Sequence, residues 1–365
     1  MALFQSLEKM GHEQVVFCQE PTTGLKAIIA IHDTTLGPAL GGCRFWNYTS
    51  EEEALHDVLR LSRGMTYKAA VSGLNLGGGK AVIIGDPTRL KSEAFFRCFG
   101  RFVDSLSGRY ITAEDVNIDV KDVEAMALET KYVTGVGSGS GDPSPFTALG
   151  VYCGIKAALK YRSEDSSLSG KKVAVQGLGH VGYHLCRLLA QEGAKLVVAD
   201  INESRVRRVI EEFKAEAVEI DTIHTQAVDI FAPCALGAIL NDKTIPELKT
   251  QIIAGAANNQ LDDEERHGKM LQKSGILYSP DYVINAGGLI NVSHELRGYD
   301  AKASETETRK IFDTLYSIFT ESEKNQIPCH QASNILAEKR IEAVRHSRAL
   351  NQKVSNQNWI HASRK

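Results

Sequence analysis

Two lysines in glycine-rich surroundings are the residues of this sequence best suited to chemistry. Lys80 follows the run Gly77-Gly78-Gly79, and Lys68 ends the segment Gly64-Met65-Thr66-Tyr67-Lys68. Glycines let backbone N–H groups approach a ligand such as a carboxylate, and a lysine packed beside them loses hydration. Lost hydration lowers the pKa of a lysine, which would make Lys80 a usable base or Schiff-base nucleophile. The residues alone leave a second interpretation open, in which Lys80 is a solvated lysine beside a flexible loop.

The same segment does not form a phosphate-binding P-loop. The pattern G-x-x-x-x-G-K-[ST] requires glycine at position 74 and a hydroxyl residue at position 81, and the chain has Leu74 and Ala81 there. No hydroxyl group therefore follows Lys80 to hold a magnesium ion.

A second glycine motif predicts a dinucleotide-binding site. The strand-like segment 171–176 leads into Gly177-Leu178-Gly179-His180-Val181-Gly182, a G-x-G-x-x-G, and a helical pattern follows over 183–192. The next strand ends at Asp200. In such a unit the glycines form a tight turn close to the pyrophosphate, the helix N-terminus donates N–H groups, and the acidic residue accepts the ribose hydroxyls.

Asp200 would repel a 2′-phosphate, so the motif favours NAD over NADP. Three nearby arginines keep NADP open, because one of them could hold that phosphate: Arg205, Arg207 and Arg208. His180 and His184 have a metal-ligand spacing, but no H-E-x-x-H pattern and no third ligand accompany them, so we expect no metal site.

Strands and helices must position these residues. Apolar runs over 15–17, 27–31 and 82–84 predict strands, and periodicity over 51–64 predicts a helix. Ser50 would be the N-cap of that helix, with Glu53 completing a capping box.

The second half of the chain alternates strands and helices. Residues 135–145 are rich in Gly, Ser and Pro, which is typical of a loop or hinge, and a helical pattern follows over 147–159. Alternation of strands with helices predicts a parallel sheet covered on both faces. The strands are predicted over 172–176, 195–199, 229–232 and 251–254. From residue 301 onward the pattern is helical, with one apolar face formed by Ile311, Leu315, Ile318 and Phe319.

Composition excludes several classes of protein. The 365 residues are 43% hydrophobic and 24% charged, with a formal net charge of −3, which argues against a nucleic-acid or membrane-surface binder. The seven cysteines are scattered without a C-x-x-C, so we expect reduced thiols rather than disulfides or zinc. With neither a signal peptide nor an apolar run of membrane-spanning length, we expect a cytoplasmic protein.

The blocks around the two lysines resemble the signature of the glutamate/leucine/phenylalanine/valine dehydrogenase superfamily, and the resemblance covers nearly the whole chain. Within it the chain is most similar to the leucine dehydrogenases. Further blocks match in order, at 38–42, 112–115, 143–147, 233–237, 255–259 and 285–288. The resemblance implies an α/β fold with an N-terminal α/β substrate domain, a Rossmann-type dinucleotide-binding domain and an active-site cleft between them.

The same resemblance implies roles for individual residues. Lys68 would pair with the substrate α-carboxylate, helped by N–H groups of Gly77 and Gly78. Lys80 would be the general base that activates water, and Asp115 would shuttle protons at the substrate nitrogen. Two lysines near one another would also disfavour each other's charged form. The cofactor site would comprise the motif residues Gly177, Gly179, His180, Val181 and Gly182, with Asp200, and also Thr147, Cys234, Ala235, Asn258 and Asn285.

Substrate choice would depend on a few apolar positions. Glutamate-specific relatives have a lysine and a serine where this chain has Leu40 and Val292, so a glutamate carboxylate would be buried there without a partner, at a cost of several kcal/mol. Ala113 is typical of leucine enzymes and Leu289 is less so; since one methylene changes discrimination only about 10–200-fold, the pocket could be broad. The predicted substrate site comprises Lys68, Leu40, Gly41, Met65, Gly77, Gly78, Ala113, Leu289 and Val292.

These implications amount to one prediction with two rivals. The prediction is NAD-dependent oxidative deamination of leucine and other branched-chain amino acids, in a homodimer or homo-octamer. The rivals are a phenylalanine or tryptophan dehydrogenase on the same scaffold, and an NAD-binding sensor without catalysis. Two domains are expected. Residues 1–134, together with a C-terminal helical segment at about 330–365, would form the domain for substrate binding and oligomerisation, and residues 135–329 would form the Rossmann domain that binds NAD.

Overall fold

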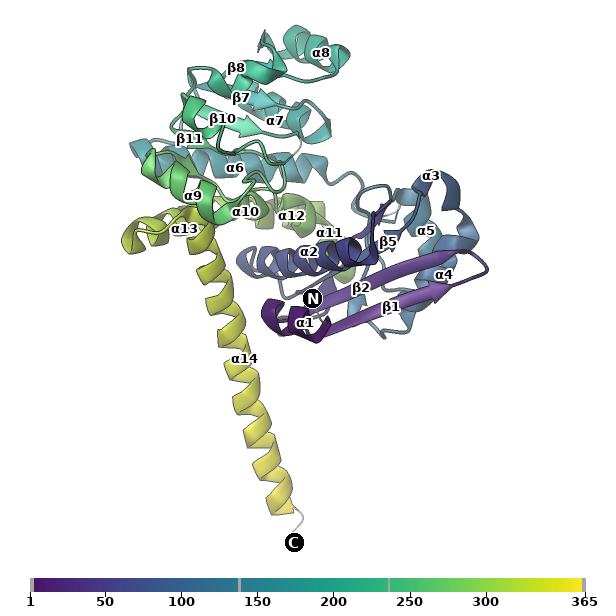
Figure 1. Cartoon of the computed structure of the whole chain (residues 1–365). Coiled ribbons are helices and arrows are strands. Elements are labelled where there is room, and N and C mark those ends of the chain that lie inside the picture. The colour runs from purple at the N-terminus through teal and green to yellow at the C-terminus, as the bar shows by residue number, and fades with distance from the viewer. Residues whose placement is uncertain (1–2, 137–138, 236, 363–365) are drawn as a thin grey trace. The chain divides into compact units, whose positions relative to one another are not determined.

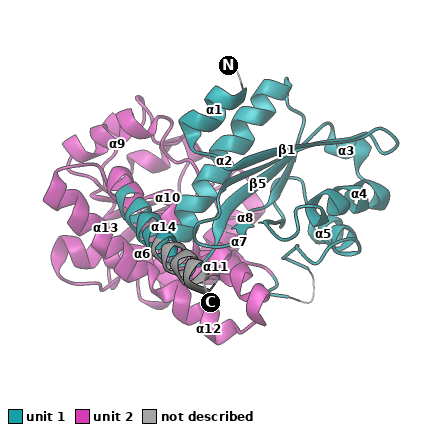
Figure 2. Ribbon diagram, turned by 90° about the horizontal axis from the view of Figure 1, so that it is seen from below, with its two compact units in different colours: residues 1–141, 335–365 teal, residues 142–334 magenta. Residues whose placement is uncertain are grey.

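The chain folds into two compact units. Unit 1 comprises residues 1–141 and 335–365, and unit 2 comprises residues 142–334 (Figure 2). The computed structural model describes the backbone of residues 3–136, 139–235 and 237–362, and side chains within these ranges as far as residue 349. The division between the units falls inside the predicted loop 135–145, of which residues 137 and 138 lie outside the described part.

Unit 1 is built on a mixed sheet with the strand order β1-β2-β5-β3-β6, in which β4 also pairs with β5. The pairs β1–β2 and β2–β5 are antiparallel, whereas β3 and β4 run parallel to β5, and β6 runs parallel to β3. The strands are β1 (Gln14–Glu20), β2 (Leu25–Asp33), β3 (Ala39–Leu40), β4 (Cys43–Trp46), β5 (Gly77–Ile84) and β6 (Tyr110–Ile111).

Helices cover both faces of this sheet, which explains why β2 is an almost unbroken apolar run. Ile28 on β2 belongs to a core with Val58 and Leu59 of helix Glu51–Val71 (α2), whereas its neighbour Ile29 belongs to a core with Phe95 of helix Glu93–Asp104 (α4). Both helices are labelled in Figure 1. Successive strand residues thus enter opposite cores. The helices of this part are α1 (Leu3–Met10), α2 (Glu51–Val71), α3 (Pro87–Leu90), α4 (Glu93–Asp104) and α5 (Val120–Ala127).

Helix α2 begins where the sequence predicts and extends beyond the predicted end. The Ser50 side chain accepts a hydrogen bond from the Glu53 N–H, which confirms the N-cap. The capping box is wrong in its second half, because the Glu53 carboxylate accepts from the N–H and hydroxyl of Thr49 instead of the Ser50 N–H. The helix continues to Val71 and therefore carries Met65 and Lys68.

Unit 2 is built on a parallel sheet with the strand order β12-β11-β10-β7-β8-β9, the doubly wound arrangement of dinucleotide-binding proteins. Strands β7 (Lys172–Gln176) and β8 (Lys195–Ala199) match the predicted strands residue for residue, and β10 (Ile230–Pro233) and β11 (Ile252–Ile253) lie within one residue of theirs. The sheet is completed by β9 (Glu216–Ala217) and β12 (Leu277–Tyr278).

Helices surround the second sheet as the alternating pattern predicts. On α13 the predicted apolar face is confirmed, because Ile311, Leu315, Ile318 and Phe319 are all buried. Helix α6 begins three residues before the predicted start, at Ser144. The helices are α6 (Ser144–Ser163), α7 (His180–Gln191), α8 (Glu203–Phe213), α9 (Glu264–Lys273), α10 (Asp281–Ile284), α11 (Gly287–Ser293), α12 (Ala301–Arg309) and α13 (Ile311–Asn325), with 3₁₀ turns at Ile220–Thr225, Ile245–Glu247 and His294–Arg297.

A long final helix, α14 (Cys329–Ala362), leaves unit 2 and belongs to unit 1 from residue 335 onward. Its residues Ala337 and Ile341 share a buried cluster with Leu36 and Ala70 of unit 1. Among the described residues, none of the helices has the length and apolar content needed to cross a membrane.

Candidate active site

Lys80 lies inside strand β5, with 6% of its surface exposed. The glycines that precede it are required by close packing on both faces of the strand. A Cβ atom at Gly78 would lie 2.1 Å from the backbone nitrogen of Thr66 on α2, and one at Gly79 would lie 2.6 Å from the ring of Tyr110. The interpretation of Lys80 as a solvated lysine beside a flexible loop is therefore wrong, and the desolvated lysine is the one found.

A carboxylate faces Lys80. The Lys80 Nζ lies 3.0 Å from Oδ2 of Asp115, and Arg44 Nε donates to the same oxygen at 3.1 Å. Burial opposes ionisation of Asp115, but Lys80 and Arg44 outweigh burial and lower the pKa of this carboxyl group. Asp115 is therefore an anion held between two cations.

Strand register explains how these three groups meet. Arg44 pairs with Val82 in the β4–β5 ladder, and Lys80 precedes Val82 by two residues, so Arg44 and Lys80 leave the same face of the sheet. Asp115 lies on a segment that runs beside β4. The Cys43 N–H of β4 donates to the carbonyl of Ala113 in this segment at 2.9 Å.

Gly42 permits the close approach of the Asp115 segment. A Cβ atom at Gly42 would lie 2.2 Å from the Glu114 carbonyl oxygen and 2.9 Å from the Cβ of Asp115. Any larger residue at this position would move Asp115 away from Lys80.

Helix α2 brings two more predicted residues to the start of β5. A Cβ atom at Gly41 would lie 1.8 Å from the carbonyl oxygen of Gly79 and 3.3 Å from Met65 Cγ, so Gly41, β5 and α2 meet at one point. Lys68 follows Met65 by one helical turn on the same side of α2 and is half-buried. Lys68 thus lies one turn beyond the α2 residue that meets Gly41.

Gly77 does not present its N–H group to a ligand. This N–H donates to the carbonyl oxygens of Pro38 at 2.9 Å and Gly37 at 3.2 Å. A Cβ atom at Gly77 would also lie 2.1 Å from the Asp33 carbonyl oxygen. The Gly77 N–H is thus bonded within the protein and this glycine is required by packing, while a carboxylate bound by other N–H groups around Gly77 and Gly78 stays a prediction.

The four predicted specificity residues divide between the units. Leu40, on β3, is buried at 2% exposure and pairs with Gly78, and Ala113 lies beside β4. Leu289 and Val292 lie on α11 and are half-buried. Leu40 and Ala113 belong to unit 1, with Lys80, and the other two belong to unit 2.

The G-x-G-x-x-G segment of unit 2 has the geometry of a dinucleotide loop. Gly177 follows β7 with a φ of +94°, which favours glycine, and a Cβ atom at Gly182 would lie 2.0 Å from the Gly177 carbonyl oxygen. Gly179 is the N-cap of α7, and no side chain accepts a hydrogen bond from the first N–H groups of this helix at the cap. A Cβ atom built at Gly179 would have no described atom within 4 Å. The helix that starts at His180 and Val181 therefore leaves its first N–H groups and the space before them for a phosphate.

Asp200 is oriented by this loop. Its Oδ2 accepts a hydrogen bond from the Leu178 N–H at 2.6 Å, and its Oδ1 accepts one from the Asn202 N–H at 2.8 Å. Arg205 lies 3.9 Å from Oδ1, and Arg208 stacks over the ring of Tyr183. Both arginines thus have contacts of their own, and Asp200 is held where a ribose hydroxyl would be accepted.

The remaining cofactor residues follow the ends of β10 and β11. Cys234 and Ala235 come directly after β10, and a Cβ atom at Gly177 would lie 2.7 Å from the Ala235 side chain. Because β7 and β10 flank the point where strand order reverses, this is where ligands bind in such sheets. Leu236, in the same block, lies outside the described residues.

Asn285 has an unsatisfied acceptor. Its Nδ2 donates to the Ala256 carbonyl at 3.0 Å and to Asn258 Oδ1 at 2.6 Å, while its Oδ1 is buried without a partner. Such an oxygen suits a donor like a carboxamide NH₂. Thr147 lies near by in the fold, since a Cβ atom at Gly288 would lie 2.8 Å from its hydroxyl.

Across the described residues, no group of three or more His, Cys, Asp or Glu side chains could hold a metal ion. His180 makes a 3.2 Å contact with Asp142, and His184 packs edge-on against Tyr183. Both border a hollow of about 400 Å³ that also includes Gly179 and Arg205. These histidines thus belong to the surroundings of the dinucleotide loop.

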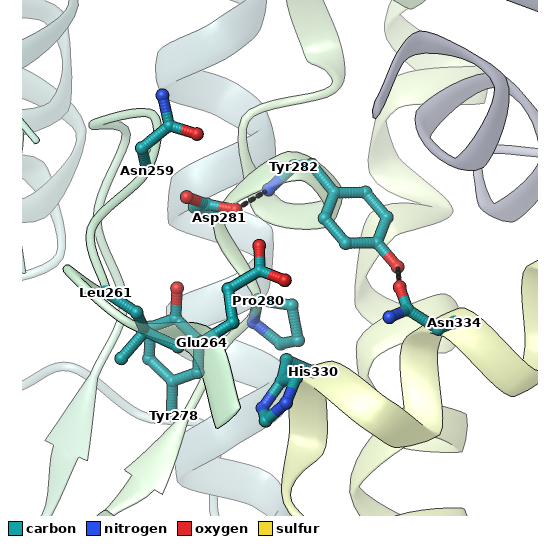
Figure 3. A pocket seen from close by; sticks show the side chains of 9 residues that line it. All are labelled: Asn259, Leu261, Glu264, Tyr278, Pro280, Asp281, Tyr282, His330 and Asn334. Atoms are coloured by element: carbon teal, nitrogen blue, oxygen red, sulfur yellow. Dashed lines mark hydrogen bonds between the residues drawn. The ribbon is translucent and has the colours of Figure 1, made fainter. Parts of the chain in front are cut away.

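A smaller hollow in unit 2 is lined by polar side chains (Figure 3). Its volume of about 10 Å³ accommodates about one water molecule. Asp281 accepts from the Tyr282 N–H at 2.6 Å, and the Tyr282 hydroxyl donates to Asn334 at 2.8 Å (Figure 3). This space is too small for a substrate.

Sequence reasoning missed Arg44 and its partner Asp57. Arg44 Nη1 lies 3.0 Å from Oδ2 of Asp57 on α2, which also accepts from the Tyr48 hydroxyl at 2.7 Å. The local sequence held no signal for Arg44, because a charged residue between two apolar residues is the ordinary pattern of a strand with one face towards water.

The fold and the two sets of residues define the class: a two-unit α/β dehydrogenase, with a lysine–carboxylate site in one unit and a doubly wound dinucleotide-binding sheet in the other. Comparison with known proteins gives the family. Residues 12–132 match the model of the Glu/Leu/Phe/Val dehydrogenase dimerisation domain, and residues 138–203 and 198–349 match that of Glutamate/Leucine/Phenylalanine/Valine dehydrogenase. The chain therefore belongs to the Glu/Leu/Phe/Val dehydrogenase family, and it is an amino-acid dehydrogenase.

Individual relatives are similar over nearly their whole length. The chain is 57% identical to leucine dehydrogenase of Geobacillus stearothermophilus over 352 residues, 96% of each chain. It is 53% identical to L-tryptophan dehydrogenase of Nostoc punctiforme over 349 residues, 96% of this chain and 99% of the relative. A crystal structure of L-tryptophan dehydrogenase from Nostoc punctiforme superposes with a TM-score of 0.86 at 52% identity, covering 94% of this chain and 100% of the other.

Proposed function

We propose that this chain catalyses the reversible, NAD-dependent oxidative deamination of L-leucine and other branched-chain amino acids to the 2-oxo acid, ammonia and NADH. The observation that carries the proposal is the pair of the buried Lys80 and the partly exposed Asp115, 3.0 Å apart, in a unit that belongs to this family. Similarity to a leucine dehydrogenase over 96% of the chain supports the choice of substrate.

Three residues of unit 1 would handle the amino acid. Lys68, on α2, would pair with the α-carboxylate. Asp115 would accept a proton from the substrate ammonium group, since its lowered pKa keeps it ionised. Lys80 would then act as the general base for a water molecule that attacks the iminium carbon. Its burial excludes bulk water from this position.

Unit 2 has the residues that NAD requires. The loop from Gly177 to Gly182 and the N-terminus of α7 would hold the pyrophosphate, Asp200 would accept the ribose hydroxyls, and the free Oδ1 of Asn285 would accept from the carboxamide. When bound, NAD supplies the hydride acceptor. The protein's part is to orient the amino acid and to move its protons.

The apolar surroundings favour an apolar substrate. Leu40 is buried, and a glutamate carboxylate beside it would lose hydration without a counter-charge, at a cost of several kcal/mol. Initial rates with leucine, valine, phenylalanine, tryptophan and glutamate test this choice. We expect leucine to give the highest kcat/KM, and a value for phenylalanine or tryptophan well above that for leucine would overturn the substrate assignment.

The L-tryptophan dehydrogenase relative makes an aromatic substrate the second candidate, since it is 53% identical to this chain. Catalysis itself is tested by Lys80→Ala, with Lys121→Ala on the exposed surface as the matched control. We expect NADH production to fall by more than about 100-fold in the first variant and to be unchanged in the second. An active Lys80→Ala enzyme would contradict the mechanism, and a wild-type chain that binds NADH but oxidises no amino acid would favour a sensor.

We also propose that the protein self-associates through unit 1, as a homodimer or homo-octamer. The β1 strand has β2 as its one partner among the described strands, and Phe17 on it is 58% exposed. Such an edge is a template for pairing with a second copy. Light scattering coupled to gel filtration is expected to show an oligomer that Phe17→Lys weakens. A monomeric wild-type chain at micromolar concentration would contradict this proposal.

Seven free cysteines, five of them buried, support a reducing compartment, so we propose a cytoplasmic location. Alkylation of thiols in intact cells followed by mass spectrometry tests it, with seven modified cysteines expected after denaturation. Disulfide-linked peptides would contradict it.

A further inference from the structure

Arg44 links the site to helix α2. Its Nε donates to Asp115 Oδ2 at 3.1 Å, and its Nη1 donates to Asp57 Oδ2 at 3.0 Å. Two different edges of one planar guanidinium therefore hold two carboxylates at fixed positions. With side chains 23% and 16% exposed, Arg44 and Asp57 are screened from water more than a surface ion pair would be.

Asp57 is anchored in its turn. The Tyr48 hydroxyl donates to Asp57 Oδ2 at 2.7 Å, and Arg60 Nη2 donates to Asp57 Oδ1 at 3.2 Å. Asp57 lies in the middle of α2, the same helix that carries Lys68. Through Arg44, Asp115 is thus tied to the helix that holds the proposed carboxylate anchor.

The two oxygens of Asp115 are used unequally. Oδ2 accepts from both Lys80 and Arg44, whereas the hydrogen bonds and ion pairs found within the described residues do not involve Oδ1. A carboxylate whose one oxygen is fixed by two donors offers its other oxygen in a defined direction. That direction is what a proton transfer to or from a substrate nitrogen needs.

Arg44 also maintains a counter-charge for Asp115 throughout the reaction. If Lys80 gives up its proton to act as a base, Asp115 loses one of its two cations. Burial opposes the charge on Arg44, but Asp115 and Asp57 raise the pKa of its guanidinium, so its positive charge persists. An ionised carboxylate therefore never stands unpaired in the buried site.

The other titratable groups near Asp115 do not supply this charge. They are Cys43 on the same strand, Tyr48 after it and Tyr110 on β6, and burial raises the pKa of each. All three remain neutral at the pH where the enzyme would work. The ionisation of Asp115 thus depends on Lys80 and Arg44.

We propose that Arg44 is a positioning residue of the reaction, which orients Asp115 so that Oδ1 meets the substrate amine and which keeps Asp115 ionised when Lys80 is deprotonated. The proposal rests on the proposed function, since it assigns Arg44 a part in amino-acid deamination. The observation that carries it is that Arg44, on β4, bonds both Asp115 and Asp57 of α2.

Arg44→Gln and Arg44→Lys test the proposal, with Arg60→Gln as the matched control. Arg60 contacts the other oxygen of the same Asp57, and 46% of its side chain is exposed. We expect Arg44→Gln to lower kcat by about 100-fold, the effect of a misplaced catalytic group. Arg44→Lys is expected to lower kcat by a smaller factor, because a lysine keeps the positive charge but cannot bond Asp115 and Asp57 through two different nitrogens. Arg60→Gln is expected to retain wild-type kcat.

Two further readouts separate positioning from folding. In Arg44→Gln the acidic limb of the pH profile of kcat is expected to move up by about one unit, because Asp115 loses a cation. Inhibition by 4-methylpentanoate, which has the carboxylate but no amine, is expected to be unchanged. A purely structural role would lower the amount of folded enzyme and leave the pH profile in place.

The outcomes distinguish the two proposals. An active wild-type enzyme whose Arg44→Gln variant keeps its kcat and its pH profile would overturn the role of Arg44 alone. A wild-type chain that oxidises no amino acid would overturn the proposed function and this inference with it. If Arg44→Gln does not fold, Asp57→Asn replaces it, and an unchanged kcat and pH profile in that variant would overturn the proposal.

Discussion

The Arg340 guanidinium of α14 donates to the backbone carbonyl of Leu74 at 2.7 Å. It also donates to the carbonyls of Ala70 at 2.9 Å and Gly73 at 2.9 Å. These carbonyls lie at and just after the end of α2, where no further helical turn supplies N–H donors and the helix dipole favours a cation. Arg340, on the final helix, thus bonds the carbonyl groups at the C-terminus of α2, the helix that carries Lys68, although 272 positions separate Arg340 from Lys68.

Replacing Arg340 by Ala is therefore expected to destabilise unit 1 by about 2 kcal/mol, because several carbonyls, two of them in part-buried hydrogen bonds, lose a charged donor. Chemical denaturation measures the change, and Arg348→Ala, on an exposed turn of the same helix, is the control. We expect the control to keep the wild-type midpoint and Arg340→Lys to fall between the two. Equal midpoints for Arg340→Ala and Arg348→Ala would show that the contact contributes nothing.

The dinucleotide loop offers a pair of glycines with opposite expected effects. Gly182→Ala would place a methyl group 2.0 Å from the Gly177 carbonyl oxygen, so it is expected to lower both stability and NADH affinity. Gly179→Ala meets no protein atom, so it is expected to spare stability and to weaken only the cofactor, whose phosphate needs that space. Thermal unfolding and NADH fluorescence titration measure the two quantities. Unaltered NADH binding by Gly179→Ala would contradict the placement of the phosphate.

A second glycine pair tests the geometry around Asp115. Gly42→Ala is expected to reduce kcat at least tenfold, because its methyl group would displace the Asp115 segment by meeting the Glu114 carbonyl at 2.2 Å. Gly64, in the exposed middle of α2, has no atom within 4 Å of a Cβ position. Gly64→Ala is therefore expected to stabilise the protein by about 1 kcal/mol. Steady-state kinetics and urea unfolding check both, and a fully active Gly42→Ala enzyme would argue against a precise Lys80–Asp115 distance.

Local patterns in the sequence were enough to predict much of this fold. Strands β7 and β8, the Ser50 N-cap and the apolar face of α13 depend on neighbouring residues, whose spacing is written in the chain. The resemblance of blocks also led to Lys80 and Asp115. Tertiary contacts set the rest: Gly77-Gly78-Gly79 form a strand because Thr66 and Tyr110 press on it from opposite faces, and no local pattern contains that information.

The site shows the same division. Arg44 escaped notice because its importance depends on Asp57, 13 positions away, and on Asp115, 71 positions away. That Lys68 and Lys80 disfavour each other's charged form stays a prediction, whereas the pairing of Lys80 with the Asp115 carboxylate, 3.0 Å away, follows from the fold. Sequence reasoning identifies the types of groups in a site, whereas the pairing of their charges follows from register and packing.

A buried histidine pair predicts how stability changes with pH. The rings of His12 and His32 lie 4.8 Å apart, edge to face, and His12 Nε2 contacts the Ser62 hydroxyl of α2 at 2.8 Å. Burial, and then the neighbouring His32, lower the pKa of His12 to about 4, and burial lowers the pKa of His32. The His12 ring is thus neutral in the folded protein at pH 6, whereas the same histidine in the unfolded chain binds a proton at its ordinary pKa of about 6.5.

A histidine whose pKa is lower in the folded state costs stability as the pH falls, because protons favour the unfolded chain. We therefore expect the unfolding midpoint to be constant above about pH 7 and to fall between about pH 6.5 and pH 4. His12→Gln, which cannot take up a proton, is expected to flatten this fall, whereas His56→Gln, on the exposed side of α2, is expected to leave it unchanged. Urea unfolding at pH 7.5, 6 and 5 measures the effect. A His12→Gln variant that loses stability as steeply as the wild type would show that other groups, such as the buried carboxylates, govern the acid limit.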